Sequence, residues 1–175
     1  MLAVPVLDMS RVVEFVNEYA DRPRAAAGEQ EMPYAEAADL LEWPDRAPLP
    51  TTSELTAAAN ATFGVFSAAH DGRAFEELNG LLRTARPTPV ASESGLRWTV
   101  ETASAILPAA LGTSLLDWLG NHDQTRLGTC HGSNCVDVYA DESPAGRRRF
   151  CSSTCLSRHK VAAYRRRRSQ PRPTH

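Results

Sequence analysis

Apolar side chains recur at helical spacing along most of the first 125 residues, and proline, glycine and aspartate separate the apolar runs. This pattern predicts a mainly helical N-terminal domain. The expected helices run from Asp8 or Ser10 through Val16, from Ala35 to Leu41 before Pro44, from Thr51 to the break at Asp71-Gly72, from Ala74 to Arg86, and from Ala103 to Leu119 despite Pro108.

Two shorter patterns refine this picture. Thr51 and Glu54 have the spacing of a capping box, in which a hydroxyl and a carboxylate satisfy each other's free amides at a helix start. Leu96 to Val100 carries alternating β-branched and aromatic residues and favours a short strand. The side chains that we expect to face the core are Leu55, Ala59, Phe63, Phe66, Phe75, Leu78, Leu81, Leu82, Leu107, Leu111, Leu115, Leu116 and the tryptophans Trp43, Trp98 and Trp118.

This region offers no recognisable catalytic set. His70 and His122 are isolated, which favours a surface position, and no carboxylate pair, Ser/His/Asp set or glycine-rich phosphate loop stands out. No apolar run approaches the roughly 20 residues of a membrane span. Met1 to Asp8 lacks the basic leader of a signal peptide. We therefore expect a cytoplasmic protein that is not an enzyme and has no membrane partner.

The charge is divided unevenly along the chain. From Arg147 onward there are ten basic residues and no acidic one, so all 21 acidic residues and the other nine basic ones lie in residues 1–146. An acidic body with a basic tail points to a polyanion partner. The alternative for such a tail alone is a solvated, disordered segment.

The cysteines favour a polyanion-binding unit over a disordered tail, because they indicate a folded metal site next to the basic segment. Four residues separate Cys130 from Cys135, fifteen separate the two pairs, and three separate Cys151 from Cys155. Two close pairs around a hairpin-sized insert suit one tetrahedral zinc ion. We expect one structural Zn²⁺, and four thiolates leave no open position for a substrate.

Other chemistry remains open at this point. The thiols could form disulfides, although a cytoplasmic setting keeps them reduced. They could also act as a redox switch, because nearby arginines lower thiol pKa values. His131 or His159 could replace a cysteine ligand.

The insert favours a strand over Val136 to Tyr139, a turn over Asp141 to Gly146 and a returning strand over Arg147 to Phe150. A helix follows from Cys155 toward Pro171. So small a unit needs the metal, which can contribute roughly 10–16 kcal/mol to its folding. Removing zinc should then unfold this unit and leave the helical body folded.

With these residues in view, the chain resembles a bacterial family that joins an N-terminal ABATE domain to a CGNR zinc finger. The finger part of the resemblance rests on the Cys130 and Cys135 knuckle, Tyr139-Ala-Asp141-Glu-Ser143, Arg148-Arg-Phe-Cys151-Ser152, Cys155 with Arg158, Lys160, and the arginine run after Tyr164. The N-terminal part rests on Val13-Glu-Phe-Val-Asn17, Leu78-Asn-Gly-Leu-Leu82 and Gly95-Leu-Arg-Trp98.

The resemblance implies an ABATE-like domain over 1–125 and a finger over 126–168, and we expect 169–175 to be a disordered tail. It also implies a transcription regulator whose finger contacts DNA. The signature departs from the family at Leu156 and Ser157, which stand where the family has Gly and Asn, and the last cysteine pair is one residue closer than usual.

Together these observations predict a zinc-dependent DNA-binding regulator with a mainly helical N-terminal domain, a short β element and a small β-hairpin/helix zinc finger. Arginine suits phosphate and guanine alike, although Arg149 could instead offset the thiolate charge. RNA, a homodimer and a small-molecule or protein effector at the N-terminal domain remain open. The alternative is a protein-interaction module that docks on an acidic surface, including its own N-terminal domain. The expected nucleic-acid contacts are Arg147, Arg148, Arg149, Arg158, Lys160, Arg165, Arg166, Arg167 and Arg168.

Overall fold

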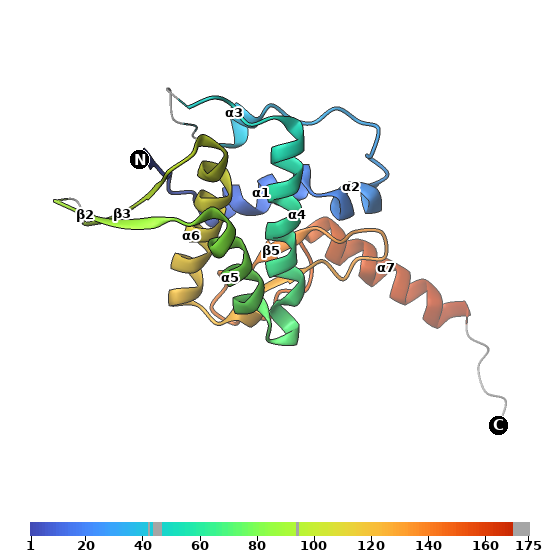
Figure 1. Cartoon of the computed structure of the whole chain (residues 1–175). Coiled ribbons are helices and arrows are strands. Elements are labelled where there is room, and N and C mark those ends of the chain that lie inside the picture. Colours follow the sequence, from blue (N-terminus) through green and yellow to red (C-terminus); the bar gives the residue numbers. More distant parts are fainter. Residues whose placement is uncertain (42, 44–46, 94, 170–175) are drawn as a thin grey trace.

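The computed structural model describes residues 1–41, 43, 47–93 and 95–169, the last three by their backbone. Helices form the body, a β ribbon extends from one side, and the C-terminal helix projects from the opposite side (Figure 1). The elements are β1 (Leu2–Ala3), α1 (Met9–Tyr19), α2 (Asp21–Ala27), α3 (Ala37–Leu40), α4 (Thr52–Ala68), η1 (Ala69–Asp71), α5 (Ala74–Ala85), β2 (Thr88–Ser92), β3 (Gly95–Val100), η2 (Ala103–Ala105), α6 (Ile106–Asn121), η3 (Gln124–Arg126), β4 (Leu127–Thr129), β5 (Val138–Ala140) and α7 (Ser153–Ser169).

The structure confirms the mainly helical domain that the apolar pattern predicted. In α1, Val12, Phe15 and Val16 are fully buried. The capping box at the start of α4 is formed: the Glu54 amide donates to the Thr51 hydroxyl over 3.3 Å, and the Thr51 amide donates to the Glu54 carboxylate over 2.8 Å. α4, α5 and α6 pack against one another beside α1 (Figure 1).

Two residues expected in the core are exposed instead. Phe75 has 46% of its surface accessible and Leu116 has 37%. On α5 the buried stripe is carried by Ala74, Leu78, Leu81 and Ala85, so Phe75 lies about 100° around the helix from it. Leu116 follows buried Leu115 and is turned away for the same reason. Trp118 is buried, whereas Trp43 and Trp98 are half-buried against the core.

Helix positions differ slightly from the expected ones. Pro108 is accommodated because it lies in the first turn of α6, where an amide hydrogen has no partner within the helix. The helix expected over Ala35 to Leu41 covers only Ala37–Leu40, and Ser169, expected in the tail, is the last residue of α7. Pro44 and residues 170–175 lie outside the described residues.

The β ribbon contains one strand that the sequence predicted and two that it did not. β3 is central in a three-stranded antiparallel sheet of order β1-β3-β2. β2 contains Pro89 and is an edge strand, which tolerates proline because its outward amides need no partner in the sheet.

One apolar stretch is longer than the sequence pattern suggested. Within the described residues, Ala103–Asn121 is long and apolar enough to cross a membrane by length and composition. Inside the fold, however, 61% of that window is buried. α6 therefore serves as a central helix of the body, and its apolar surface is accounted for by packing against α1, α4 and α5.

The hairpin of the cysteine region differs from the predicted one. β5 pairs with β4, with Leu127 opposite Ala140 and Thr129 opposite Val138, and not with residues 147–150. The other edge of β5 is already taken, because the Asn17 side chain donates to the Val138 carbonyl over 3.1 Å and accepts from its amide over 2.7 Å. At Val138, the outer edge of β5 is therefore closed to a returning strand.

Candidate metal centre and basic surface

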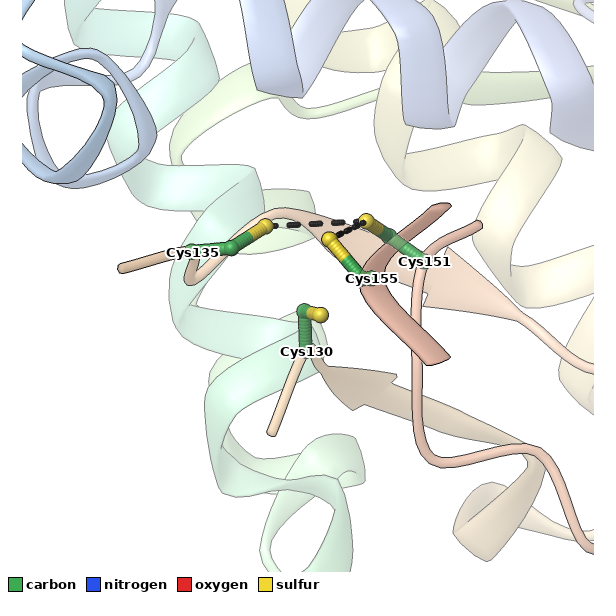
Figure 2. A group of neighbouring side chains, drawn as sticks. All are labelled: Cys130, Cys135, Cys151 and Cys155. Atoms are coloured by element: carbon green, nitrogen blue, oxygen red, sulfur yellow. Dashed lines mark hydrogen bonds between the residues drawn. The ribbon is translucent and has the colours of Figure 1, made fainter. Parts of the chain in front are cut away.

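The four cysteines come together at one point between the hairpin and α7. Their sulfur atoms all lie within 4.8 Å of one another, and they converge from two sides in Figure 2. The sulfurs of Cys135 and Cys151 are 3.5 Å apart and those of Cys151 and Cys155 are 3.6 Å apart. A tetrahedral ion with zinc–sulfur bonds of about 2.3 Å requires sulfur separations of about 3.8 Å, so the cluster fits zinc.

The first pair of ligands is carried by the hairpin. Cys130 follows β4 directly, and its amide donates to the Asp137 carbonyl over 2.8 Å, which extends the pairing beyond β5. The Gly132 amide donates to the Cys130 sulfur over 3.4 Å. A Cβ at Gly132 would lie 3.3 Å from the Cys135 Cβ and 3.4 Å from the Cys130 Sγ, so any side chain there would crowd the ligands.

The second pair is fixed by the start of α7. Cys151 precedes the helix, and Cys155 lies in its first turn. The Ser152 hydroxyl accepts from the Cys155 amide over 3.2 Å, which is the geometry of a helix N-cap. The helix dipole at this end stabilises a thiolate on Cys155.

The thiols differ in how readily they ionise. Burial raises the pKa of the Cys135 thiol to about 12 and also raises the pKa of the Cys151 thiol. Burial opposes ionisation of Cys155 as well, but hydrogen bonds with Ser152 and the neighbouring thiols outweigh it and lower its pKa. A divalent cation that replaces the protons would let all four sulfurs act as ligands.

The histidines do not join this set. His131 and His159 are exposed, and the metal-binding group found among the described residues consists of cysteines alone. The His159 ring lies 5.1 Å from the Phe150 ring, centroid to centroid. His70, expected to be an isolated surface residue, is exposed but places Nε2 3.5 Å from the Tyr139 hydroxyl.

A network around Asp141 supports the segment between the cysteine pairs. Asp141 is buried and accepts from the amides of Ser143 over 3.0 Å and Arg148 over 2.7 Å. Burial opposes ionisation, but these hydrogen bonds and the nearby Arg126 keep the pKa of Asp141 below its usual value. The Arg126 guanidinium donates to the carbonyls of Asp141 over 3.0 Å and Ser143 over 2.6 Å. In the sequence, the run Asp-Glu-Ser-Pro from Asp141 favours an Asx turn and so indicates the bond to the Ser143 amide.

Tyr139 connects this network to the cysteines. Its ring is buried, and its hydroxyl donates to the Arg148 carbonyl over 2.8 Å. A Cβ at Gly128 would lie 2.7 Å from that hydroxyl, so β4 can approach only because this position is glycine.

The structure divides the predicted nucleic-acid contacts into two kinds. The Arg148 guanidinium donates to the carbonyls of Phe150 over 2.9 Å, of Ala140 over 3.2 Å and of Cys151. It therefore stabilises the backbone next to the candidate ligand Cys151. The neighbouring Arg147 and Arg149 are exposed, as are Arg158 and Lys160 on α7.

Arg165 and Arg166 are also exposed near the end of α7. Arg167 and Arg168 continue the helix, and their side chains lie outside the described part. We define the basic surface as Arg147, Arg149, Arg158, Lys160, Arg165 and Arg166.

Comparison with known families agrees with this geometry. The CGNR zinc finger model matches residues 126–168, a range that holds all four cysteines and nearly all of α7. A search of curated proteins finds no significant match. The cluster and the family match identify a zinc finger region with a site for one structural zinc ion. The resemblance of the N-terminal residues to ABATE is consistent with that match.

Proposed function

We propose that this protein binds double-stranded DNA through its basic surface and acts as a transcription regulator. The observation that carries the proposal is the junction of two basic segments at the zinc site. The sulfurs of Cys151 and Cys155 belong to one cluster, so a shared ion would hold the Arg147–Arg149 segment beside the start of α7. Zinc would thereby give a fixed shape to a set of phosphate-binding side chains.

The form of α7 suits a groove of DNA. Its 17 residues extend about 25 Å, and the major groove admits an α-helix. The helix projects away from the body (Figure 1). Eighteen of the 21 acidic residues lie in residues 1–125, and projection of the helix keeps their negative charge away from a polyanion.

The flank of α7 offers a place for the DNA backbone. Arg147, Arg149, Ser152 and Ser153 line a depression of about 360 Å³ beside the first turn of the helix. Among the described residues no carboxylate lies within salt-bridge distance of Arg147, Arg149, Arg158 or Lys160. Their charges are thus available to phosphates. Contacts of this kind position a protein on DNA, and base contacts from the helix give sequence preference.

The helical body would supply the regulatory part, as a domain that senses a signal or recruits a partner. A homodimer would present two such helices to a two-fold operator. A cytoplasmic location and the absence of an enzymatic activity accompany this proposal.

A protein partner is the second candidate. Leu156, Val161 and Tyr164 are exposed on α7 by 37%, 49% and 57%, which is more apolar surface than phosphate contacts need. An acidic protein or an RNA would be bound through the same arginines, with Tyr164 as a stacking surface for a base.

The experiment compares two exposed arginines. Fluorescence anisotropy would measure affinity of the zinc-loaded protein for duplex DNA, with Arg158→Ala on the basic surface and Arg83→Ala on α5 as the matched control. We expect R158A to weaken binding on every duplex and to reduce the salt slope by about 1, with R83A unchanged. Equal behaviour of the two variants would remove α7 from the interface. Tighter binding to RNA or to an acidic peptide would favour the second candidate.

A further inference from the structure

The helical body contains a pocket that lies apart from the zinc site. It has a volume of about 620 Å³ and is lined by the first half of α4, the second half of α5, the start of α6 and the segment before α4. None of the described residues that line it belongs to residues 126–168. The volume is in the range of small-molecule sites.

The pocket exists because small residues meet where three helices come together. Ala58 and Ala61 from α4 face Gly80 from α5, and Leu81 and Leu107 contribute apolar walls. A Cβ added at Gly80 would meet nothing within 4 Å, so the glycine leaves open space at this wall. Ala61 is exposed, which opens the pocket to solvent.

The charge of the lining indicates what the pocket can hold. Among the described residues of the lining, the charged ones are Glu54 and Glu77, both acidic. The Glu54 carboxylate is committed to the capping box, where it accepts from the Thr51 amide and hydroxyl, each over 2.8 Å. Within the described part of the chain, no hydrogen bond or ion pair engages the Glu77 carboxylate.

We propose that this pocket binds a small molecule with an apolar body and a cationic amine, and that the amine pairs with Glu77. The walls of alanine, leucine and proline remove the apolar part from water, which supplies most of the affinity. The carboxylate selects the charge of the ligand. This inference concerns the body alone and does not depend on DNA binding.

The test uses two probes of equal apolar size and opposite charge, 4-phenylbutylamine and 4-phenylbutyrate. The indole N–H of Trp43, which lines the pocket, reports occupancy by NMR chemical shift, and Trp43→Phe assigns its resonance. The full chain with zinc is titrated with each probe. We expect saturable shifts with the amine and at least about fivefold weaker binding of the carboxylate.

Two variant pairs locate the site. Gly80→Leu fills the pocket and raises helix propensity, and Gly120→Leu adds the same side chain to an exposed helical glycine outside it. G80L should abolish the shifts, and G120L should retain them. Glu77→Gln should weaken amine binding about fivefold, and Glu76→Gln, next to it on α5, should not.

Amine binding that survives G80L would overturn the proposed site. Equal or tighter binding of the carboxylate, or an E77Q variant indistinguishable from E76Q, would overturn the ligand class. No saturable shift with the amine would overturn the proposal as a whole, provided that the NMR spectrum shows the protein folded.

Discussion

At the scale of single residues, adjacent arginines have different environments. Arg148 donates to three carbonyls around the zinc site, and its amide binds Asp141. Arg149 is exposed, and its own carbonyl accepts from the His131 amide over 3.0 Å. The first arrangement stabilises the finger, whereas the second leaves a guanidinium free to face a phosphate.

Substitution of each arginine should therefore have a distinct effect. Arg148→Ala should lower the free energy of unfolding by about 1–3 kcal/mol, because it leaves carbonyls near the metal without a charged donor. Arg149→Ala should change stability little and weaken DNA binding instead. Urea denaturation and anisotropy on the same samples check this, and a stability loss of equal size in both variants would contradict the assignment.

The raised thiol pKa values predict how zinc affinity depends on pH. Burial raises the pKa of Cys135 to about 12 and raises that of Cys151, so at neutral pH both thiols hold protons that zinc must displace. Affinity should fall as pH falls, by about tenfold per unit for each proton displaced. Calorimetry in buffers of different ionisation enthalpy counts the protons. Binding without proton release would show that the thiols are already ionised.

Residue identity alone predicted the metal site but not these roles. The cysteine spacing is enough to predict the site, because the short loop within each pair keeps its two thiols close together. Three consecutive arginines are equivalent in sequence, and only the folded chain determines which guanidinium meets the carbonyls. The resemblance includes Asn17 but does not reveal its role, since its partners on Val138 are backbone atoms.

At the scale of elements, α7 depends on its first turn. It begins at Ser152 and the cysteine ligands, and the described part of its surface is largely exposed and basic. Most of the stability of a helix in a protein comes from tertiary packing, and α7 has little of it. β4 and β5, by contrast, place Leu127, Val138 and Ala140 in the main core.

Zinc removal should consequently act on part of the finger. The sequence suggested that the whole unit would unfold without the metal. The structure limits the expected unfolding to α7, because β4 and β5 pack in the main core. Hydrogen exchange should show loss of protection in α7 after chelation, with β4 and β5 still protected by the core. Loss of protection in β5 at the same rate as in α7 would contradict this division.

The strands show where short patterns mislead. A strand over Val136 to Tyr139 was expected to pair with residues 147–150, but so short a strand carries too little alternation to specify a partner. The partner, β4, lies before Cys130 and has no strand signature of its own. The long helices were predicted well because their apolar stripes repeat over several turns.

At the scale of the whole molecule, body and finger share one core. The Asn17 side chain on α1 holds the edge of β5, and Leu127 and Val138 are fully buried among residues of the body. The charge asymmetry marks the basic segment but does not reveal where the core ends. Deletion of residues 1–120 would thus remove the packing around β4 and β5 and destabilise the finger.

Asn17 provides the test of this connection. Asn17→Ala leaves the amide and carbonyl of Val138 without partners and should destabilise the zinc-loaded protein by about 1–3 kcal/mol. Asn79→Ala, an exposed asparagine on α5, is the matched control. We expect one cooperative transition at a lower urea midpoint. An unchanged midpoint would contradict the proposed link between α1 and β5.

If zinc organises the basic surface for DNA, binding should depend on both the metal and the salt concentration. Fluorescence anisotropy with pooled duplex DNA is recorded across a salt series for the zinc-loaded and the chelated protein. We predict log–log slopes of about −0.9 per neutralised phosphate with zinc and much weaker binding without it. No binding by the zinc-loaded protein at low salt, or equal binding after zinc is removed, would contradict the account.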